Sequence, residues 1–426
     1  MQTPVDQAVL VGAPSRDLDL RLADEHLQEL ARLTDTAGGT VVGTLQQRLD
    51  RPNPRFYIGE GKADELGRLV ESTDANLVIF DEELSPAQGK NLEEVLDVRV
   101  MDRSELILDI FATRARSSEA RMQVELAQLE YLLPRLRRMW SHLSRIRGGI
   151  GLRGPGETQL ETDRRLIGTR IADLKAKLRD VAKARAVQRK SRQGQFRVAL
   201  VGYTNAGKSS LLRALSGADL FVENRLFATL DSATRTVELG SGYSALLTDT
   251  VGFIRKLPHH LVASFRSTLE EAREADVLLH VIDASHPDRE EQRQVVREVL
   301  DELELGEVEQ VLVFNKVDRL SEVELESLRE RVRALEPFPA VFVSALEPDS
   351  LTPLKETLKA RMRARLTRVR IRLPAKDGEA LASLYREGEV LEREDDGRRI
   401  TVTARLPSPI LGRLEAREGV VVEPLE

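Results

Sequence analysis

The segment GYTNAGKSS, from Gly202 to Ser210, constrains the fold of this 426-residue chain more than any other feature. It directly follows the apolar run FRVALV and lies at the start of a predicted helix. A glycine-rich loop between a buried strand and a helix can hold a phosphate, because loop N–H groups and the helix N-terminus point at the same place. The sequence therefore predicts a P-loop in a doubly wound α/β domain.

The residues of this loop have separate expected roles. Gly202 and Gly207 let the backbone turn its N–H groups toward the β-phosphate. Lys208 is expected to reach the β- and γ-phosphate oxygens, and Ser209 to ligate Mg²⁺. The residues expected to line the nucleotide here are Gly202, Tyr203, Thr204, Asn205, Ala206, Gly207, Lys208, Ser209 and Ser210.

Two later motifs indicate which base is bound. The segment NKVD at 315–318 follows the apolar strand QVLVF, and the carboxylate of Asp318 can accept two hydrogen bonds that guanine offers and adenine does not. The segment SAL at 344–346 also ends an apolar run, and its Ala345 N–H is expected to contact the guanine O6. The motifs predict GTP, with the base contacted by Asn315, Lys316, Asp318, Ser344, Ala345 and Leu346.

A phosphate-sensing switch is expected between the P-loop and the guanine motifs. Asp249 follows the strand ALLT and is expected to hold Mg²⁺ through a water, while the Gly252 N–H senses the γ-phosphate. Thr229, in the stretch RLFATLD, is the candidate for the second protein ligand of Mg²⁺, and Phe227 is placed beside the nucleotide. Lys208, Thr229, Asp249, Gly252 and Asn205 are thus the candidate catalytic residues.

Phe253 occupies the position at which many GTPases carry a glutamine that orients the attacking water. A phenylalanine cannot do this, so either another group positions the water or a partner completes the site. Asn205 has two possible roles: coordinating K⁺ against the phosphates, or bracing the loop through its amide. The sequence leaves both roles open.

The composition excludes several classes of function. The chain has no cysteine, which excludes disulfides, thiolate metal sites and cysteine nucleophiles. No run approaches the ~20 apolar residues of a membrane span, and the N-terminus lacks the pattern of a signal peptide. We therefore expect a cytoplasmic protein without a membrane span, and a monomer.

Changes in pattern along the chain predict four units. Strand and helix signals alternate at both 1–103 and 195–366, which predicts an N-terminal α/β domain with a mainly parallel sheet and a GTPase domain. The region 104–194 lacks strand signals. The order of elements in 367–426 is βαββαβ, which predicts a small ferredoxin-like α+β domain.

The region 104–194 is predicted to be an antiparallel helical hairpin. Apolar residues recur at heptad intervals from Met122 to Leu136 and from Ile167 to Val181, on either side of a glycine-rich tip at 148–156. A kink is expected at Pro134. Although the net charge is −6, residues 131–156 contain six arginines and no acid. A basic tip suits RNA phosphates, and the expected RNA contacts are Arg145, Arg147, Gly149 and Arg153.

Four parts of the chain resemble the HflX-type ribosome-associated GTPases, in the Obg-HflX group of P-loop GTPases. They are YIGEGKADEL at 57–66, the run at 102–136, the loop GGIGLRGPGETQLETDRR at 148–165, and the GTPase motifs. The resemblance covers most of the chain. It implies a factor that binds the large ribosomal subunit, has its GTPase stimulated there, and splits or rescues stalled ribosomes, often under heat stress.

Alternatives to this function stay open. The chain could be an anti-association factor that uses GTP only as an occupancy signal. It could be an ATP-using RNA remodeller with a second nucleotide site at Gly59, Gly61 and Lys62, although GEGK lacks the P-loop spacing. It could also be a switch GTPase in a non-ribosomal process.

Overall fold

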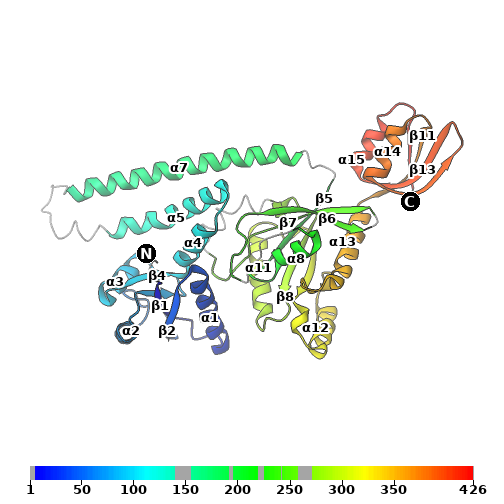
Figure 1. The fold of residues 1–426 in the computed structure, drawn as a ribbon. Helices are drawn as coiled ribbons and strands as arrows, with labels where there is room; N and C mark the ends of the chain where they lie inside the picture. Colours follow the sequence, from blue (N-terminus) through cyan, green and yellow to red (C-terminus); the bar gives the residue numbers. More distant parts are fainter. Residues whose placement is uncertain are drawn as a thin grey trace.

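The computed structural model describes residues 5–139, 155–190, 195–218, 225–240, 242–257 and 271–425. Figure 1 shows an N-terminal α/β domain, a pair of long helices, a second α/β domain and a small C-terminal domain. This arrangement confirms the predicted fold class. Within the described residues, no helix combines the length and the apolar character needed to cross a bilayer.

The N-terminal domain is built on a four-stranded sheet in which all strands are parallel, in the order β2-β1-β3-β4. Its helices begin at well-formed caps: Asp19 accepts two N–H groups of α1, and Ser85 forms a capping box with Gln88 in α3. The elements are β1 (Gln7–Gly12), α1 (Leu20–Ala37), β2 (Thr40–Gln46), α2 (Glu60–Thr73), β3 (Leu77–Phe80), α3 (Pro86–Leu96) and β4 (Arg99–Asp102).

The predicted hairpin consists of α5 (Ser118–Met139) and α7 (Pro155–Lys190), which follow α4 (Arg103–Arg114). The two helices lie side by side and run in opposite directions (Figure 1), and Leu174 of α7 is fully buried. Helix α5 continues through Pro134. It also buries a second face, with Val124, Ala127 and Tyr131, against the N-terminal domain, and the heptad pattern did not predict this.

Helix α7 begins at Pro155, inside the stretch 148–156 that was predicted to be the tip. Proline is favoured at the first helical position, because its missing N–H would have no partner there. The predicted RNA contacts Arg145, Arg147, Gly149 and Arg153 lie outside the described residues.

The second α/β domain, the predicted GTPase domain, has a six-stranded sheet in the order β10-β9-β8-β5-β7-β6. Five strands are parallel, and the edge strand β6, which the sequence analysis did not predict, is antiparallel to β7. The elements are β5 (Phe196–Gly202), α8 (Lys208–Ser216), β6 (Ala233–Gly240), β7 (Tyr243–Asp249), β8 (Val277–Asp283), α11 (Arg289–Glu302), β9 (Gln310–Asn315), α12 (Glu322–Leu335), β10 (Ala340–Phe342) and α13 (Thr352–Ala364).

The C-terminal domain has the predicted βαββαβ order. Its strands form an antiparallel sheet in the order β12-β13-β11-β14, which is the ferredoxin-like arrangement. The elements are β11 (Thr367–Pro374), α14 (Gly378–Glu387), β12 (Glu389–Asp395), β13 (Arg399–Leu406), α15 (Ser408–Glu415) and β14 (Val421–Pro424).

One apolar core passes from the N-terminal domain into the GTPase domain. It contains Leu30 and Phe111 from the first and Tyr203, Phe227 and Phe253 from the second. The last three residues belong to the P-loop and to the two segments expected to respond to the nucleotide. Packing between the two domains therefore reaches the candidate site itself.

Candidate nucleotide site

The P-loop connects the end of β5 to the start of α8, as the sequence predicts. Gly207 has a φ of +96°, and a Cβ on it would lie 2.2 Å from Asn315 Nδ2. A side chain at this position is excluded by both the backbone conformation and the neighbouring strand. Asn205 also has a positive φ, of +60°, and its side chain is exposed. The loop geometry therefore depends on contact with the guanine motif.

Lys208 lies almost completely buried at the floor of the loop. Its Nζ donates to the carbonyl oxygens of Gly202 (3.0 Å) and Tyr203 (2.9 Å). Burial lowers the pKa of this amine from its ordinary value to about 8. Gly252 lies directly against it, because a Cβ on Gly252 would be 3.0 Å from Lys208 Nζ and 2.7 Å from Thr204 Cα. The lysine and the switch glycine thus meet at one point.

Three oxygen-bearing side chains converge beside the lysine. The hydroxyl of Ser209 lies 2.5 Å from the hydroxyl of Thr229 and donates to Asp249 Oδ2 over 2.6 Å. The other carboxylate oxygen, Asp249 Oδ1, is buried without a hydrogen-bond partner among the described residues. Burial raises the pKa of Asp249, because it disfavours the charged carboxylate. A cation bound nearby would act in the opposite direction and favour the charged form. Hard oxygen ligands around an unpaired buried carboxylate fit Mg²⁺.

The base motifs are joined to the P-loop and to each other by hydrogen bonds. Asn315 donates through Nδ2 to the Ala206 carbonyl (2.9 Å) and accepts the Ala345 N–H (3.1 Å). The Ser344 hydroxyl donates to Asp318 Oδ1 over 2.6 Å. The second carboxylate oxygen of Asp318 belongs to an exposed residue and faces no such partner among the described residues. Leu346 is exposed, and its N–H donates to the Ser344 hydroxyl.

Asp283 belongs to this group, and the sequence analysis did not identify it. It ends β8, and its Oδ2 accepts a hydrogen bond from Lys316 Nζ over 2.6 Å. The same ammonium donates to the Asn205 carbonyl (2.8 Å). A carboxylate at the end of the apolar run VLLHVI was the available signal, because parallel strands end at the same edge of the sheet.

The segment after Gly252 pairs with the P-loop. Thr204 N–H donates to the Phe253 carbonyl (2.6 Å), and Phe253 N–H donates to the Gly202 carbonyl (3.1 Å). The Phe253 side chain is only 2% exposed and lies in the core shared with the N-terminal domain. Phe253 therefore packs this segment against the P-loop.

A buried group of charges from the N-terminal domain holds the same segment. Arg103, which is 1% exposed, forms ion pairs with Glu29 and with Asp81 (2.9 Å), and its Nε donates to the Arg255 carbonyl. Arg255 pairs with Asp81 (3.1 Å), as does Lys256 (2.8 Å). Burial alone would raise the pKa of Asp81, but the three neighbouring cations outweigh it and hold that pKa below its ordinary value.

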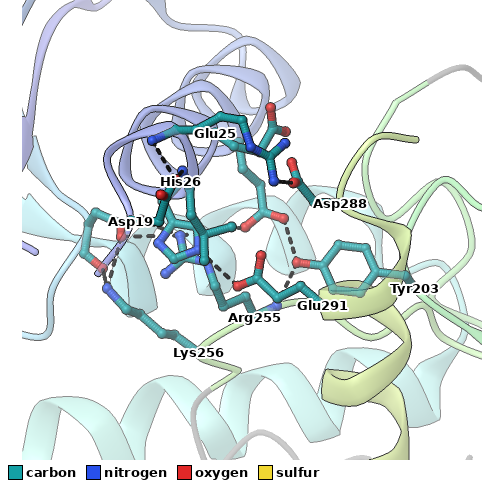
Figure 2. Close-up of polar contacts among 12 residues, drawn as sticks. Asp19, Glu25, His26, Tyr203, Arg255, Lys256, Asp288 and Glu291 are labelled. Carbon is teal, nitrogen blue, oxygen red and sulfur yellow. Dashed lines mark hydrogen bonds and ion pairs between the residues drawn. The ribbon is translucent and has the colours of Figure 1, made fainter. Parts of the chain in front are cut away.

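Tyr203 links the P-loop to this group of charges. Its hydroxyl accepts the Arg255 N–H (2.9 Å) and donates to Glu29. Burial, together with the charge of Glu29, raises the pKa of this hydroxyl well above its ordinary value, so it remains a donor. Figure 2 shows Tyr203, Arg255 and Lys256 at the interface, with His26 next to Glu291, 3.0 Å away, in a second contact between the domains.

The segment considered for a second nucleotide site begins helix α2. Gly59 is the N-cap residue, and its N–H donates to the side chain of Gln47. Lys62 Nζ lies 2.9 Å from Glu65, one turn further along the helix. These contacts are typical of a helix start, and a second nucleotide site at this segment stays an untested alternative.

Comparison with known families covers most of the chain. Residues 24–112 match the family described as GTP-binding GTPase N-terminal, residues 114–192 match GTP-binding GTPase Middle Region, and residues 197–316 match 50S ribosome-binding GTPase. The first two matches cover the N-terminal sheet and the hairpin, and the third covers the P-loop and extends into the NKVD motif.

Two relatives named GTPase HflX agree with these matches. GTPase HflX of Flavobacterium psychrophilum is 49% identical over 76% of this chain and 78% of its own length. GTPase HflX of Caldanaerobacter subterraneus subsp. tengcongensis is 46% identical over 96% of this chain and 93% of its own. A solved GTP-binding protein from the hyperthermophilic archaeon Sulfolobus solfataricus, in complex with GDP, is 25% identical, with a TM-score of 0.44, over 83% of this chain and all of that one. The chain belongs to the HflX family of GTPases.

Proposed function

We propose that this chain binds GTP with Mg²⁺ at the site described, hydrolyses it, and acts on ribosomes. The proposed partner is mainly the large subunit, which stimulates hydrolysis, and the proposed outcome is the splitting or rescue of stalled ribosomes. The observation that carries the proposal is the convergence of Ser209, Thr229 and Asp249 at a P-loop that also bonds to Asn315 of the guanine motif. Membership in the HflX family and the match to a 50S ribosome-binding GTPase support the ribosomal part.

In this proposal the guanine base is recognised by Asp318. Its carboxylate accepts the N1–H and the exocyclic amine of guanine, while Ser344 holds it in place. An adenine would leave that carboxylate unpaired, and this cost discriminates against ATP. The stem of Lys316 packs along the base, and the Ala345 N–H, which donates to Asn315 Oδ1 in this structure, would exchange that bond for one to the O6 atom.

The phosphates are bound by the P-loop N–H groups and by Lys208. Ser209 and Thr229 would ligate Mg²⁺, with Asp249 acting through a water, and the ion would neutralise charge on the β- and γ-phosphates. The Gly252 N–H donates to the γ-phosphate. Because Gly252 precedes Phe253, loss of the γ-phosphate would release the segment that packs between the two domains.

The attacking water is the incomplete part of the site. Phe253 offers no polar group and is buried, so a ribosomal component is proposed to orient the water. Asn205, at the exposed side of the P-loop, is proposed to coordinate K⁺ against the phosphates. In the absence of the ribosome, turnover is therefore expected to be slow.

The test is GTP turnover, measured in K⁺ and in Na⁺ buffers, with and without purified large ribosomal subunits. Stimulation by the subunits is expected, with faster turnover in K⁺ and none in Lys208→Ala. Equal rates in both salts would remove the role given to Asn205. Intact turnover without any stimulation would keep the GTPase and reject the ribosomal partner.

A further inference from the structure

Thr229 lies between two anchors that come from outside the GTPase domain. On one side, the ring of Phe227 packs edge-on against Phe111 of α4, with centroids 4.6 Å apart at 80°. On the other side, Asp231 Oδ2 accepts the backbone N–H groups of Arg116 (3.1 Å) and Ser117 (3.2 Å). The short segment that carries Thr229 is thus held at both ends by the corner between α4 and α5.

The first anchor holds its residue in an unusual backbone conformation. Phe227 has a φ of +55°, which bulky side chains rarely adopt. It is 1% exposed, and its N–H donates to the Thr204 hydroxyl (2.9 Å). Such a conformation persists only when the surroundings fix it. Phe227 is fixed by the P-loop through its backbone and by α4 through its ring.

The second anchor is part of the start of the hairpin. Ser117 immediately precedes α5, and its hydroxyl accepts the Ala120 N–H (3.0 Å) while donating to Asp231 Oδ1. The first N–H groups of a helix have no partner inside it, and a negative charge near them is favourable. Asp231 supplies this charge from a residue 114 positions further along the chain.

We infer that Asp231 is a positioning residue for Thr229, acting through the two residues that directly precede α5. The inference rests on the proposed function, because it takes Thr229 as a ligand of Mg²⁺. Binding is reciprocal: if the α4–α5 corner favours the ligating position of Thr229, then GTP with Mg²⁺ stabilises the start of α5 to the same extent. The base of the hairpin therefore responds to the γ-phosphate state.

The first measurement is the Mg²⁺ concentration that gives half-maximal GTP turnover. Asp231→Ala removes the acceptor of three hydrogen bonds, and we expect a rise of about ten-fold, with GDP affinity in EDTA unchanged. Asp231→Asn keeps one acceptor oxygen and should recover part of the effect. Asp377→Ala is the matched control, because Asp377 caps α14 in the C-terminal domain by accepting the Ala380 N–H (3.0 Å), far from this site.

The second measurement is hydrogen exchange at the amides of Ser117 and Ala120. In the unmodified chain, a GTP analogue with Mg²⁺ should slow this exchange relative to GDP, and Asp231→Ala should abolish the difference. A role limited to local stability would shift exchange equally in both nucleotide states. If Asp231→Ala does not fold, Ser117→Ala keeps the backbone contacts to Asp231 but removes the hydroxyl that donates to Asp231 and accepts the Ala120 N–H. Ala120 should then exchange faster in both nucleotide states, and the difference between the states should shrink by less than in Asp231→Ala.

The outcomes separate the two proposals. Absence of Mg²⁺-dependent turnover in the unmodified chain would reject the proposed function. Normal turnover there, with an unchanged Mg²⁺ requirement and an unchanged nucleotide effect on exchange in the Asp231 and Ser117 variants, would reject the positioning role alone.

Discussion

The two ends of the nucleotide site are supported in different ways. The base end is complete within the GTPase domain, where Asn315, Lys316 and Ser344 bond to neighbours that also lie in that domain. The phosphate end is shared, since Tyr203 contacts Glu29 and the segment after Gly252 contacts Asp81. Recognition of the base can therefore stay constant while the response to the γ-phosphate depends on how the N-terminal domain is packed.

The chemistry of the two supports differs as well. At the base end, the contacts are mostly amide and hydroxyl hydrogen bonds, with one ion pair between Lys316 and Asp283. At the phosphate end, charged groups are buried together, and removal of one partner leaves another charge buried without compensation. Substitutions at the phosphate end should therefore cost more free energy than substitutions at the base end. The following predictions run from the largest expected effect to the smallest.

Arg103→Met should break the phosphate end and spare the base end. It leaves Glu29 and Asp81 buried without their central cation, so we expect the N-terminal domain to lose about 3–5 kcal/mol of unfolding free energy. Hydrogen exchange at β1 and β3 measures this loss. Arg99→Met is the control, since Arg99 pairs with Glu105 at the surface and should cost less than about 1 kcal/mol. Equal losses in the two variants would show that the buried charges are not a common support.

Asp318→Asn should damage the base end alone. It removes the carboxylate that accepts two guanine hydrogen bonds, and we expect the preference for GTP over ATP to fall by about 100-fold. Competition against labelled GDP measures the preference. Xanthosine nucleotides serve as the internal control, because the new amide can donate to the 2-carbonyl of xanthine. Retained selectivity for GTP would place the base elsewhere.

The pH dependence of binding should report on Lys208. Burial lowers the pKa of Lys208 to about 8 in the protein without nucleotide, so its ammonium group loses a proton as the pH rises through 8. A bound phosphate favours the charged form and raises that pKa, so nucleotide affinity should fall by up to about ten-fold per pH unit above 8. The free protein should gain stability over the same range, up to the ordinary lysine pKa of about 10.4, since burying the neutral amine costs less. An affinity that is flat from pH 7 to 9.5 would contradict the buried lysine.

Ser344→Ala should give the smallest effect. It removes the hydroxyl that holds Asp318 Oδ1, and GTP affinity should fall by about five-fold, the effect of one net hydrogen bond. Isothermal titration measures the change, and the Mg²⁺ requirement should stay as it was. A change in the Mg²⁺ requirement would mean that the two ends are coupled more closely than their contacts indicate.

The same difference explains what the sequence could predict. The P-loop, the DTVG segment and the guanine motifs are short and each stands at the end of a buried strand, so local order was enough to place them together. Thr229 could be named as a candidate from the sequence, and the fold brings its hydroxyl to Ser209. The contacts of Glu29, Asp81 and Asp231 could not be predicted, because an acidic residue in a sequence does not indicate a partner more than 100 positions away.

The separation between Asp81 and Arg255 also sets an order of events during synthesis. Arg103 follows Asp81 by 22 residues and can pair with it at once, whereas Arg255 follows by 174 residues. At about 5–20 residues per second, the ribosome needs on the order of ten seconds or more to supply it. During that interval the N-terminal domain has its central ion pair but lacks the GTPase-domain side of the shared core, including Phe227, which later packs against Phe111. The N-terminal domain, which emerges first, is thus completed only when the GTPase domain has been made.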